Sequence, residues 1–369
     1  MDRQIKGTIA HVFDEISAGL KGGFGRPSRV GLTTAGSEHG EEELKRGASL
    51  AEAADLEVVL IAEEDTAQAH SRMEAMLDAG ELDAAVTMHY SFPIGVSTVG
   101  RVITPGFGRR MYIASTTGTS DTERVSAMVK NAISAIAVAK ACGNEAPTLG
   151  ILTLDGSRQT ERALREMQGA GYPVALAKSG RADGGVVMRG NDLLQGVPDI
   201  MVMDSLTGNV MMKVMSAFST GGNYESLGDG YGPGVGEGYG RIVNIVSRAS
   251  GAPVVANAIR YAAACARGGL PEKVREEFAR ARRAGLDAVL QGLAQPAQER
   301  GAAVQPPPEK AVSEEITGVE ILVLEDAVRA VWAKGIYATS GMGCTGPVIM
   351  VAEEDHGPAV EALRAAGFL

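Results

Sequence analysis

The chain has 369 residues, enough for two domains or one large one. An apolar fraction of 45% supports a buried core, while a net charge of −10 and 4% aromatic residues argue against nucleic acid as the main partner. The first residues lack a basic and then apolar signal segment, and no run of 18 apolar residues occurs. We therefore expect a cytoplasmic protein that does not enter a membrane.

Short apolar strands alternate with helical periodicity along the chain, which predicts an α/β fold with mostly parallel sheets. An amphipathic segment at 9–20 comes first, and strands are then expected at 29–32, 58–62, 84–88, 111–114, 149–154, 173–177, 197–203, 242–246, 319–324 and 348–352. Helices are expected at 41–54, 66–79, 121–141, 157–169, 210–218, 252–266, 272–293, 326–334 and 358–366. Residues 295–310 contain three consecutive prolines and are interpreted as a linker or exposed arm.

A polar turn with one glycine, residues 204–209, connects the strand at 197–203 to the helix that follows. The N-terminus of a helix offers free backbone N–H groups and a positive dipole end, which suit phosphate. Asp204, Thr207 and Asn209 therefore stand where a phosphate-bearing ligand could be bound. Alternatively, Thr207 or Asn209 is only the N-cap of the helix.

Two further segments have open interpretations. The hydroxyl-rich stretch STTGTS, residues 115–120, precedes the helix at 121–141 and is either an anion site or a solvated turn. Residues 228–241 carry glycine at every second position, which does not match the G-x-G-x-x-G dinucleotide fingerprint. This stretch is either a flexible or closely packed loop, such as a lid or partner contact, or a surface loop without a ligand.

The three cysteines are far apart and form no metal-ligand spacing with the five histidines, so no metal site is expected. Cys142 and Cys265 lie in apolar helical segments and are interpreted as packed core residues. Cys344 instead lies in the glycine-rich stretch GMGCTGP, where free N–H groups can activate a thiol. It is either a reactive thiol or a small residue in a turn.

Several segments resemble known families. DSLTGNV, residues 204–210, is similar to the Asp-Gly-x-Thr-Gly-Asn-Val element of the phosphate acyltransferases of fatty-acid and phospholipid synthesis, with Ser205 replacing the first glycine. The tail GCTGPVIMVAEEDHG loosely resembles the ending of those enzymes. Longer segments resemble the alpha subunits of component C of glycine/sarcosine/betaine reductase complexes. They are GLTTAGSEHG, HYSFPIGVSTVGRVITP, STTGTSDTERVSAMVKNAI, RADGGVVMRGNDLL, TGGNYESLGDGYGPGVGE and VSRASGAPVVANAIRYAAA.

The resemblance implies a two-lobed fold like that of isocitrate and isopropylmalate dehydrogenases, shared with phosphotransacetylases. With the break at 146–147 as the crossing, the first lobe is expected to span 1–145, with 353–369 returning to it. The second lobe is expected to span 146–352, and to include the glycine-rich loop 228–241 and the proline-rich linker 295–310.

The resemblance also implies an activity. Component C takes an acetyl group as an enzyme thioester and releases it onto inorganic phosphate as acetyl phosphate, so phosphate is a substrate and no cofactor is expected. The acyl-accepting cysteine of the family corresponds to Cys344, with Asp204 and Asn209 as further catalytic residues. Phosphate and substrate binding is expected from Thr207, Gly208, Lys213, Ser115, Thr116, Thr117, Thr119, Arg260 and Thr345.

Expected partners are a thiolase-like beta subunit and a selenoprotein that carries the carboxymethyl group, in a homodimer or hetero-oligomer. Two other functions remain open. The chain could be a stand-alone phosphate acyltransferase that uses acyl-coenzyme A or acyl carrier protein. It could also be a non-catalytic subunit that supports the thiolase-like partner.

Overall fold

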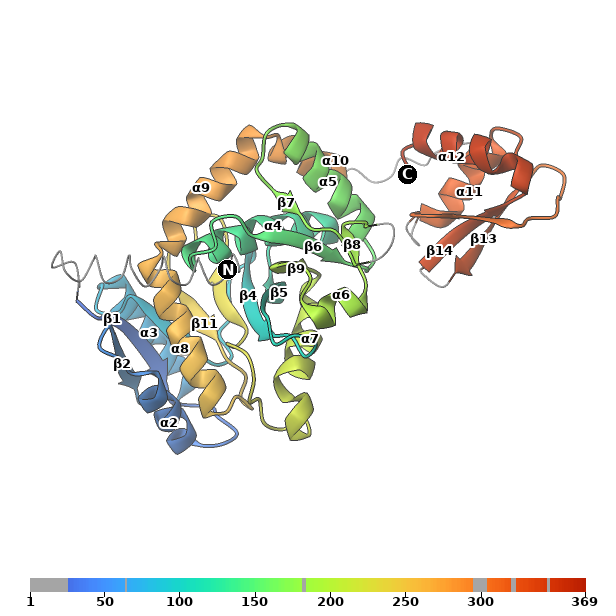
Figure 1. Cartoon of the computed structure of the whole chain (residues 1–369). Coiled ribbons are helices and arrows are strands. Elements are labelled where there is room, and N and C mark those ends of the chain that lie inside the picture. The colour runs from blue at the N-terminus through green and yellow to red at the C-terminus, as the bar shows by residue number, and fades with distance from the viewer. Residues whose placement is uncertain (1–25, 64, 181–183, 295–303, 320–322, 344–345) are drawn as a thin grey trace, which may run out of the picture.

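A computed structural model describes residues 26–63, 65–180, 184–294, 304–319, 323–343 and 346–369 (Figure 1). The expected helix at 9–20, Cys344 and Thr345 lie outside these ranges. The strands are β1 (Ser28–Thr33), β2 (Leu56–Ile61), β3 (Ala84–Thr87), β4 (Val96–Ile103), β5 (Arg110–Thr119), β6 (Thr148–Leu152), β7 (Ala175–Leu176), β8 (Val187–Met188), β9 (Ile200–Val202), β10 (Gly232–Val235), β11 (Val243–Ile245), β12 (Glu314–Thr317), β13 (Ala338–Gly343) and β14 (Gly346–Val351). The helices are α2 (Glu41–Ala51), α3 (Thr66–Asp78), α4 (Arg124–Ala141), α5 (Ser157–Gly169), α6 (Gly190–Gln195), α7 (Ser205–Ala217), α8 (Ala252–Arg267), α9 (Leu270–Arg283), α10 (Leu286–Ala294), α11 (Leu324–Trp332) and α12 (His356–Ala365).

One large mixed sheet has the order β2-β1-β3-β11-β10-β4-β5-β9-β6-β7, with β8 also paired to β6. Its two ends are parallel, as the alternating pattern predicts. Three antiparallel pairs lie between them, β11 with β10, β10 with β4, and β4 with β5. Because three reversals separate the two parallel groups, β1, β3 and β11 run opposite to β5, β9 and β6. The carboxyl ends of the two groups therefore emerge at opposite edges of the sheet.

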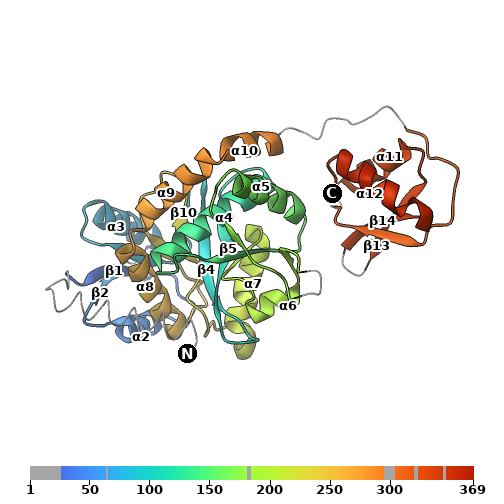
Figure 2. The same ribbon diagram turned by 45° about the horizontal axis from the view of Figure 1, so that its top comes forward.

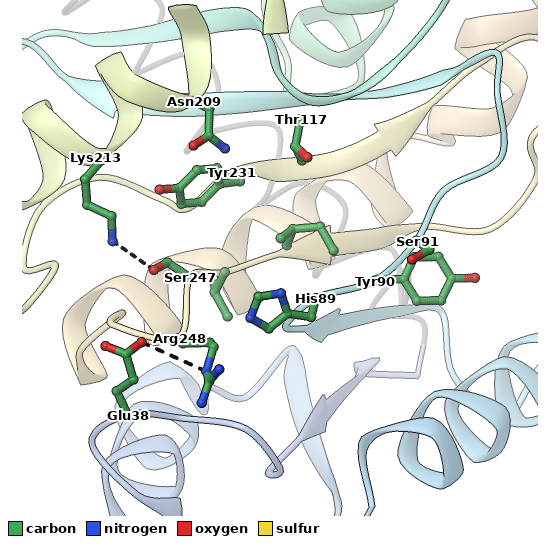
Figure 3. Close-up of a pocket in the computed structure, with 12 residues that line it drawn as sticks. Glu38, His89, Tyr90, Ser91, Thr117, Asn209, Lys213, Tyr231, Ser247 and Arg248 are labelled. Carbon is green, nitrogen blue, oxygen red and sulfur yellow. Dashed lines mark hydrogen bonds and ion pairs between the residues drawn. The ribbon is translucent and has the colours of Figure 1, made fainter. Parts of the chain in front are cut away.

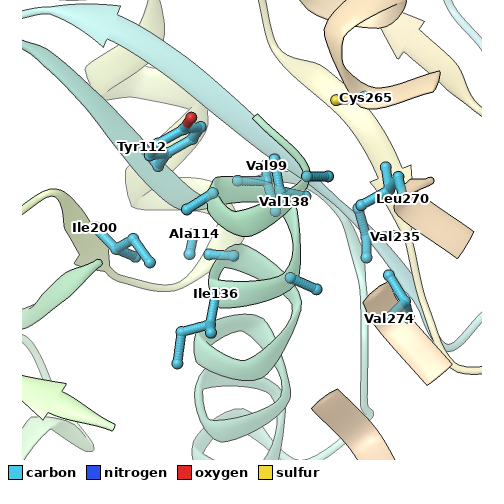
Figure 4. Packing of buried hydrophobic residues seen from close by; sticks show 14 of the residues in the cluster. Val99, Tyr112, Ala114, Ile136, Val138, Ile200, Val235, Cys265, Leu270 and Val274 are labelled. Atoms are coloured by element: carbon cyan, nitrogen blue, oxygen red, sulfur yellow. The ribbon is translucent and has the colours of Figure 1, made fainter. Parts of the chain in front are cut away.

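Alternating side chains of the strands enter two hydrophobic cores, one on each face of the sheet. On β5, Tyr112 and Ala114 belong to the core that also contains residues of α2, α4, α5, α8 and α9, whereas Met111 and Ile113 belong to the core that contains residues of α3, α6 and α7. Figures 1 and 2 show these two helical layers. Figure 4 shows the first core around α4, whose residues are buried on nearly all sides. Cys265 is fully buried there and its sulfur lies 3.8 Å from that of Cys142, which agrees with the core interpretation of both.

Most of the glycine-rich segment is closely packed, which is one of the expected alternatives, and its middle forms strand β10 of the sheet; residues 237–241 are half-buried or exposed. Residues 228–236 are buried, and β10 lies between β11 and β4. A Cβ added at Gly232 would lie 1.7 Å from the carbonyl oxygen of Val99, and one at Gly234 would lie 2.2 Å from the Phe92 ring. The glycines are therefore required by close packing in the middle of the sheet. The periodicity of the sequence predicts neither β10 nor its neighbour β4.

The C-terminal residues form a separate small unit with the strand order β12-β14-β13. Its own core includes Ile316, Val328, Ile349 and Leu363, and a hydrogen bond of 2.8 Å from Arg162 Nη1 to the Gly367 carbonyl joins it to α5. Here β12 lies at Glu314–Thr317, and Leu324, expected to end a strand, begins α11. Residues 320–322 of that expected strand lie outside the described ranges.

The structure also differs from the expected lobes and helices. Residues 353–369 pack in the small C-terminal unit, not on the first lobe, and strands on both sides of residue 145 pair in one sheet. The helix expected at 272–293 is divided into α9 and α10, because Gly285 between them has a φ of +90°, in the left-handed region.

Candidate functional site

A cavity of about 440 Å³ opens between α7 and the carboxyl end of β11 (Figure 3). Its walls come from segments that follow β1, β3 and β11, from β5, from α7 and from the start of the glycine-rich segment. The lining residues are Glu38, His89, Tyr90, Ser91, Thr117, Asn209, Lys213, Tyr231, Ile245, Val246, Ser247 and Arg248.

Helix α7 begins at Ser205, five residues earlier than expected, because Asp204 is its N-cap. The Asp204 carboxylate accepts hydrogen bonds from the backbone N–H groups of Leu206 and Thr207, each at 3.1 Å. It also accepts from the Thr207 hydroxyl at 2.8 Å and lies 3.2 Å from Arg124 Nη2. Burial opposes ionisation of this carboxyl, but the contacts of Thr207 and Arg124 hold its pKa below the ordinary value. Asp204 and Thr207 therefore organise the start of α7 and do not line the cavity, and neither Thr207 nor Asn209 is the N-cap.

Helix α7 is held closely against β5. A Cβ added at Gly208 would lie 1.8 Å from the Ser115 carbonyl oxygen, so a glycine is needed for this approach. The next residue, Asn209, lines the cavity and its Nδ2 donates to the Thr116 carbonyl at 3.1 Å. The contact of Gly208 with β5 therefore determines where Asn209 meets the cavity.

Residues 115–119 belong to strand β5, around an irregularity in its pairing with β4, and do not form the expected turn before a helix. Ser115 and Thr116 are fully buried. The Thr116 hydroxyl lies 2.6 Å from that of Thr98 and donates to the Tyr231 carbonyl at 2.7 Å. The remaining hydroxyl bonds run from Ser115 to the Thr117 carbonyl at 3.2 Å and from Thr119 to the Asp121 carbonyl at 2.6 Å. Of these four predicted residues, Thr117 lines the cavity.

Lys213 is held at the cavity wall by a buried network. Its Nζ lies 2.5 Å from Glu225 Oε1 and donates to the Ser247 hydroxyl at 3.0 Å. Glu225 is fully buried and also accepts hydrogen bonds from Tyr231 at 3.2 Å and Ser250 at 2.7 Å. Burial and the neighbouring Glu225 carboxylate raise the pKa of Tyr231 far above its ordinary value, so its hydroxyl remains a donor.

Arg248 provides the second cation of the cavity. Its Nε donates to the Gly36 carbonyl at 3.0 Å and lies 4.0 Å from Glu38 Oε1. The Glu38 backbone N–H donates to the Arg248 carbonyl at 2.8 Å, which joins the segment after β1 to the segment after β11. Figure 3 shows Lys213, Ser247 and Arg248 around the same space.

Arg260, expected to bind phosphate, is placed elsewhere. It lies on α8, where its guanidinium donates to the Leu50 carbonyl and to Asn257 Oδ1 and does not line the cavity. Cys344 and Thr345 lie outside the described residues, in the sequence between β13 and β14.

Glu38, His89, Ser247 and Arg248 line the cavity but were not predicted as site residues. Each follows a strand of the first parallel group, and polar residues at a strand end are the signal that could have identified them. His89 also has a φ of +51°, which is uncommon for a residue other than glycine and often marks a functional position.

Within the described ranges, every helix falls short of the length and apolarity needed to cross a bilayer. In the same part of the chain, no group of three or more His, Cys, Asp or Glu side chains is arranged to hold a metal ion.

Comparisons with known proteins identify the family. Residues 28–350 match the family described as fatty acid synthesis protein, and the chain belongs to this family. Over 383 aligned positions and 99% of both sequences, the chain is 51% identical to the glycine/sarcosine/betaine reductase complex component C subunit alpha of Peptoclostridium acidaminophilum. These two matches confirm the resemblance stated from the sequence segments. A solved structure, a branched-chain phosphotransacylase from Enterococcus faecalis V583, is 16% identical with a TM-score of 0.43, covering 64% of this chain and 99% of its own.

Proposed function

We propose that the chain transfers an acyl group from a thioester to inorganic phosphate, which binds in the cavity beside α7. The observation that carries this proposal is the arrangement of Lys213, Arg248 and the Ser247 hydroxyl around one space. Ammonium, guanidinium and hydroxyl groups are the donors that bind phosphate oxygens in proteins. Membership of a fatty acid synthesis family and similarity to a reductase component C subunit support the same class of chemistry.

The reaction requires few groups from the protein. A phosphate oxygen attacks the thioester carbonyl, a C–O bond forms, and the C–S bond then breaks with its electron pair leaving on sulfur as thiolate. Phosphate is already anionic, so the protein needs to orient it and to stabilise the tetrahedral oxyanion. Lys213 has three N–H groups, of which its contacts with Glu225 and Ser247 use two, so the third can bind phosphate. Thr117 and the second N–H of Asn209 are donors on the adjacent wall.

The resemblance to component C alpha subunits extends this proposal to the acyl carrier, the acyl group, the partners and the two-lobed fold. Cys344 carries the acyl group as a thioester, the group is acetyl, and the product is acetyl phosphate. A thiolase-like beta subunit and a selenoprotein act with the chain in a hetero-oligomer. The fold is two-lobed, as in isocitrate dehydrogenases, with the cavity between the two parallel ends of the sheet.

Trapping of the product with hydroxylamine tests the function, because acyl phosphates give hydroxamates. The purified complex with its thioester-forming components should produce hydroxamate only when inorganic phosphate is present. Cys344→Ala should abolish this product and the labelling of residue 344 by iodoacetate. Cys142→Ala is the matched control, since Cys142 contacts Cys265 in the core, and it should retain activity. Full activity of the Cys344→Ala complex would exclude the covalent route.

The position of the cavity favours a second candidate. Among the described residues, those that line the cavity lie between 38 and 248, on and beside the large sheet, and come from outside the C-terminal unit. This arrangement would suit a phosphate acyltransferase that uses a soluble acyl thioester directly. Hydroxamate formation by the Cys344→Ala chain from acyl-coenzyme A and phosphate would support that candidate, and its absence in the wild-type chain alone would count against it.

A further inference from the structure

Each cation of the cavity has a carboxylate beside it. Lys213 contacts Glu225 at 2.5 Å, and Arg248 faces Glu38 at 4.0 Å (Figure 3). The two pairs differ in burial, because the Glu225 side chain is 1% exposed and the Glu38 side chain is 54% exposed. Two positive and two negative formal charges therefore surround a cavity whose hydrogen-bond donors suit an anion.

We infer that Glu225 and Glu38 are specificity-determining residues that limit the affinity of the cavity for anions. The inference rests on the proposed function and concerns phosphate in the same cavity. A phosphate oxygen that accepts a hydrogen bond from the third N–H of Lys213 would lie one hydrogen bond beyond Nζ, roughly 4 Å from Glu225 Oε1. Repulsion between like charges at this separation is large in a partly buried site. Glu225 thus holds the ammonium in place and offsets its charge.

A limited affinity for anions has a function in a phosphate-dependent acyl transfer. An acyl phosphate product keeps the phosphate group, so a cavity with uncompensated cations would retain product as firmly as substrate. Binding both equally tightly does not accelerate the chemical step. Carboxylates beside the cations allow phosphate to be oriented and the acyl phosphate to leave.

Glu225→Gln separates the charge from the hydrogen bonds. Lys213 and Tyr231 both contact Oε1, which glutamine retains as an acceptor, and the Ser250 hydroxyl can accept from the new amide nitrogen. Lys213 therefore stays in position while the negative charge is removed. A purely structural role for Glu225 would predict weaker phosphate binding, whereas removal of a repulsive charge predicts tighter binding.

The test is calorimetric titration of the full-length chain with inorganic phosphate at about pH 8, where phosphate is mostly dianionic. Glu225→Gln should lower the Kd about tenfold, equivalent to about 1.4 kcal/mol. Glu38→Gln should lower it about twofold at low ionic strength, and this effect should disappear in concentrated salt because the pair is exposed.

Glu277→Gln is the matched control. Glu277 is a buried glutamate that contacts a lysine and a tyrosine, Lys140 at 2.7 Å and Tyr172 at 3.2 Å, on helix α9 away from the cavity. Its replacement should change the unfolding temperature and leave the phosphate Kd unchanged.

Unchanged or weaker binding by Glu225→Gln would overturn the inference. If that variant does not fold, an unchanged Kd of Glu38→Gln at low ionic strength overturns it instead. A wild-type chain that binds no phosphate refutes both the proposed function and this inference. Phosphate binding by the wild type with equal binding by Glu225→Gln refutes the inference alone.

Discussion

Replacing Gly208 with alanine should force helix α7 away from strand β5. The added Cβ would lie 1.8 Å from the Ser115 carbonyl oxygen, where ordinary contact begins at 3.4 Å. The obstructing atom belongs to the backbone of a strand paired on both sides, so it cannot rotate away as a side chain can. The helix must therefore move by roughly 1.5 Å or the strand must distort.

The cost of this overlap should be about 3 kcal/mol or more, at the upper end for overpacked cores. For a domain of this size that corresponds to a decrease in Tm of about 6 °C or more. Movement of α7 also displaces Asn209 and Lys213 from the cavity wall, so phosphate affinity should fall together with stability.

Urea unfolding followed by circular dichroism measures the first effect, and phosphate titration measures the second. Gly169→Ala is the matched control, because Gly169 lies in helix α5 and a Cβ there would meet no atom within 4 Å. That variant should be as stable as the wild type or up to about 1 kcal/mol more stable, through better helix propensity. A Gly208→Ala chain with wild-type stability and phosphate affinity would refute the packing of α7 described above.

Further predictions concern single polar contacts. Asp204→Ala should destabilise the chain by about 1 kcal/mol through loss of the N-cap of α7. Because the folded pKa of Asp204 is depressed, its charge contributes stability above the unfolded pKa near 3.8, and this is lost as pH falls through the folded value. Asp204→Asn should therefore show a weaker loss of Tm between about pH 5 and pH 2 than the wild type, and an identical acid profile would contradict this. Asp229→Ala should cost about 3–5 kcal/mol in urea unfolding, since it leaves the largely buried guanidinium of Arg101 without its buried carboxylate partner. Stability within about 1 kcal/mol of the wild type, as for an exposed ion pair, would show that the pair is solvated. Arg260→Ala should leave the phosphate Kd unchanged, whereas a tenfold loss of phosphate affinity would show that Arg260 binds phosphate.

The local elements could be predicted because each is governed by neighbours in the chain. The strands β1, β3, β6, β9 and β11 are short apolar runs followed by polar residues, and the helices after them show regular apolar spacing. The start of α7 was less accurate, because residues 205–209 were assigned to the turn before it. Glycine at every second position obscured β10, since glycine usually weakens strands and its use here depends on Val99 and Phe92, which are distant in sequence.

The predicted site residues fall into two groups, those that line the cavity and those whose polar groups are bonded within the fold. Asn209, Lys213 and Thr117 were predicted and line the cavity, while Asp204, Thr207, Ser115 and Thr116 have their polar groups bonded within the fold. Sequence alone does not show whether a hydroxyl is available or already bonded. The distinction depends on partners such as Tyr231, more than one hundred residues away along the chain.

The order of residues by itself determined the alternation of strands and helices, the apolar faces that fill both cores, and the family. Only the tertiary structure decided which polar residues meet. Three antiparallel pairs lie between the two parallel ends of the sheet and reverse the strand direction. The turn at Asp204, after β9, therefore lies at the edge of the sheet opposite to the carboxyl end of β11. Helix α7 then runs back along the sheet, and its nine residues from Ser205 to Lys213 cover roughly 13 Å. That length brings Lys213 to Glu225 and Ser247, a meeting produced by sheet topology and helix length together.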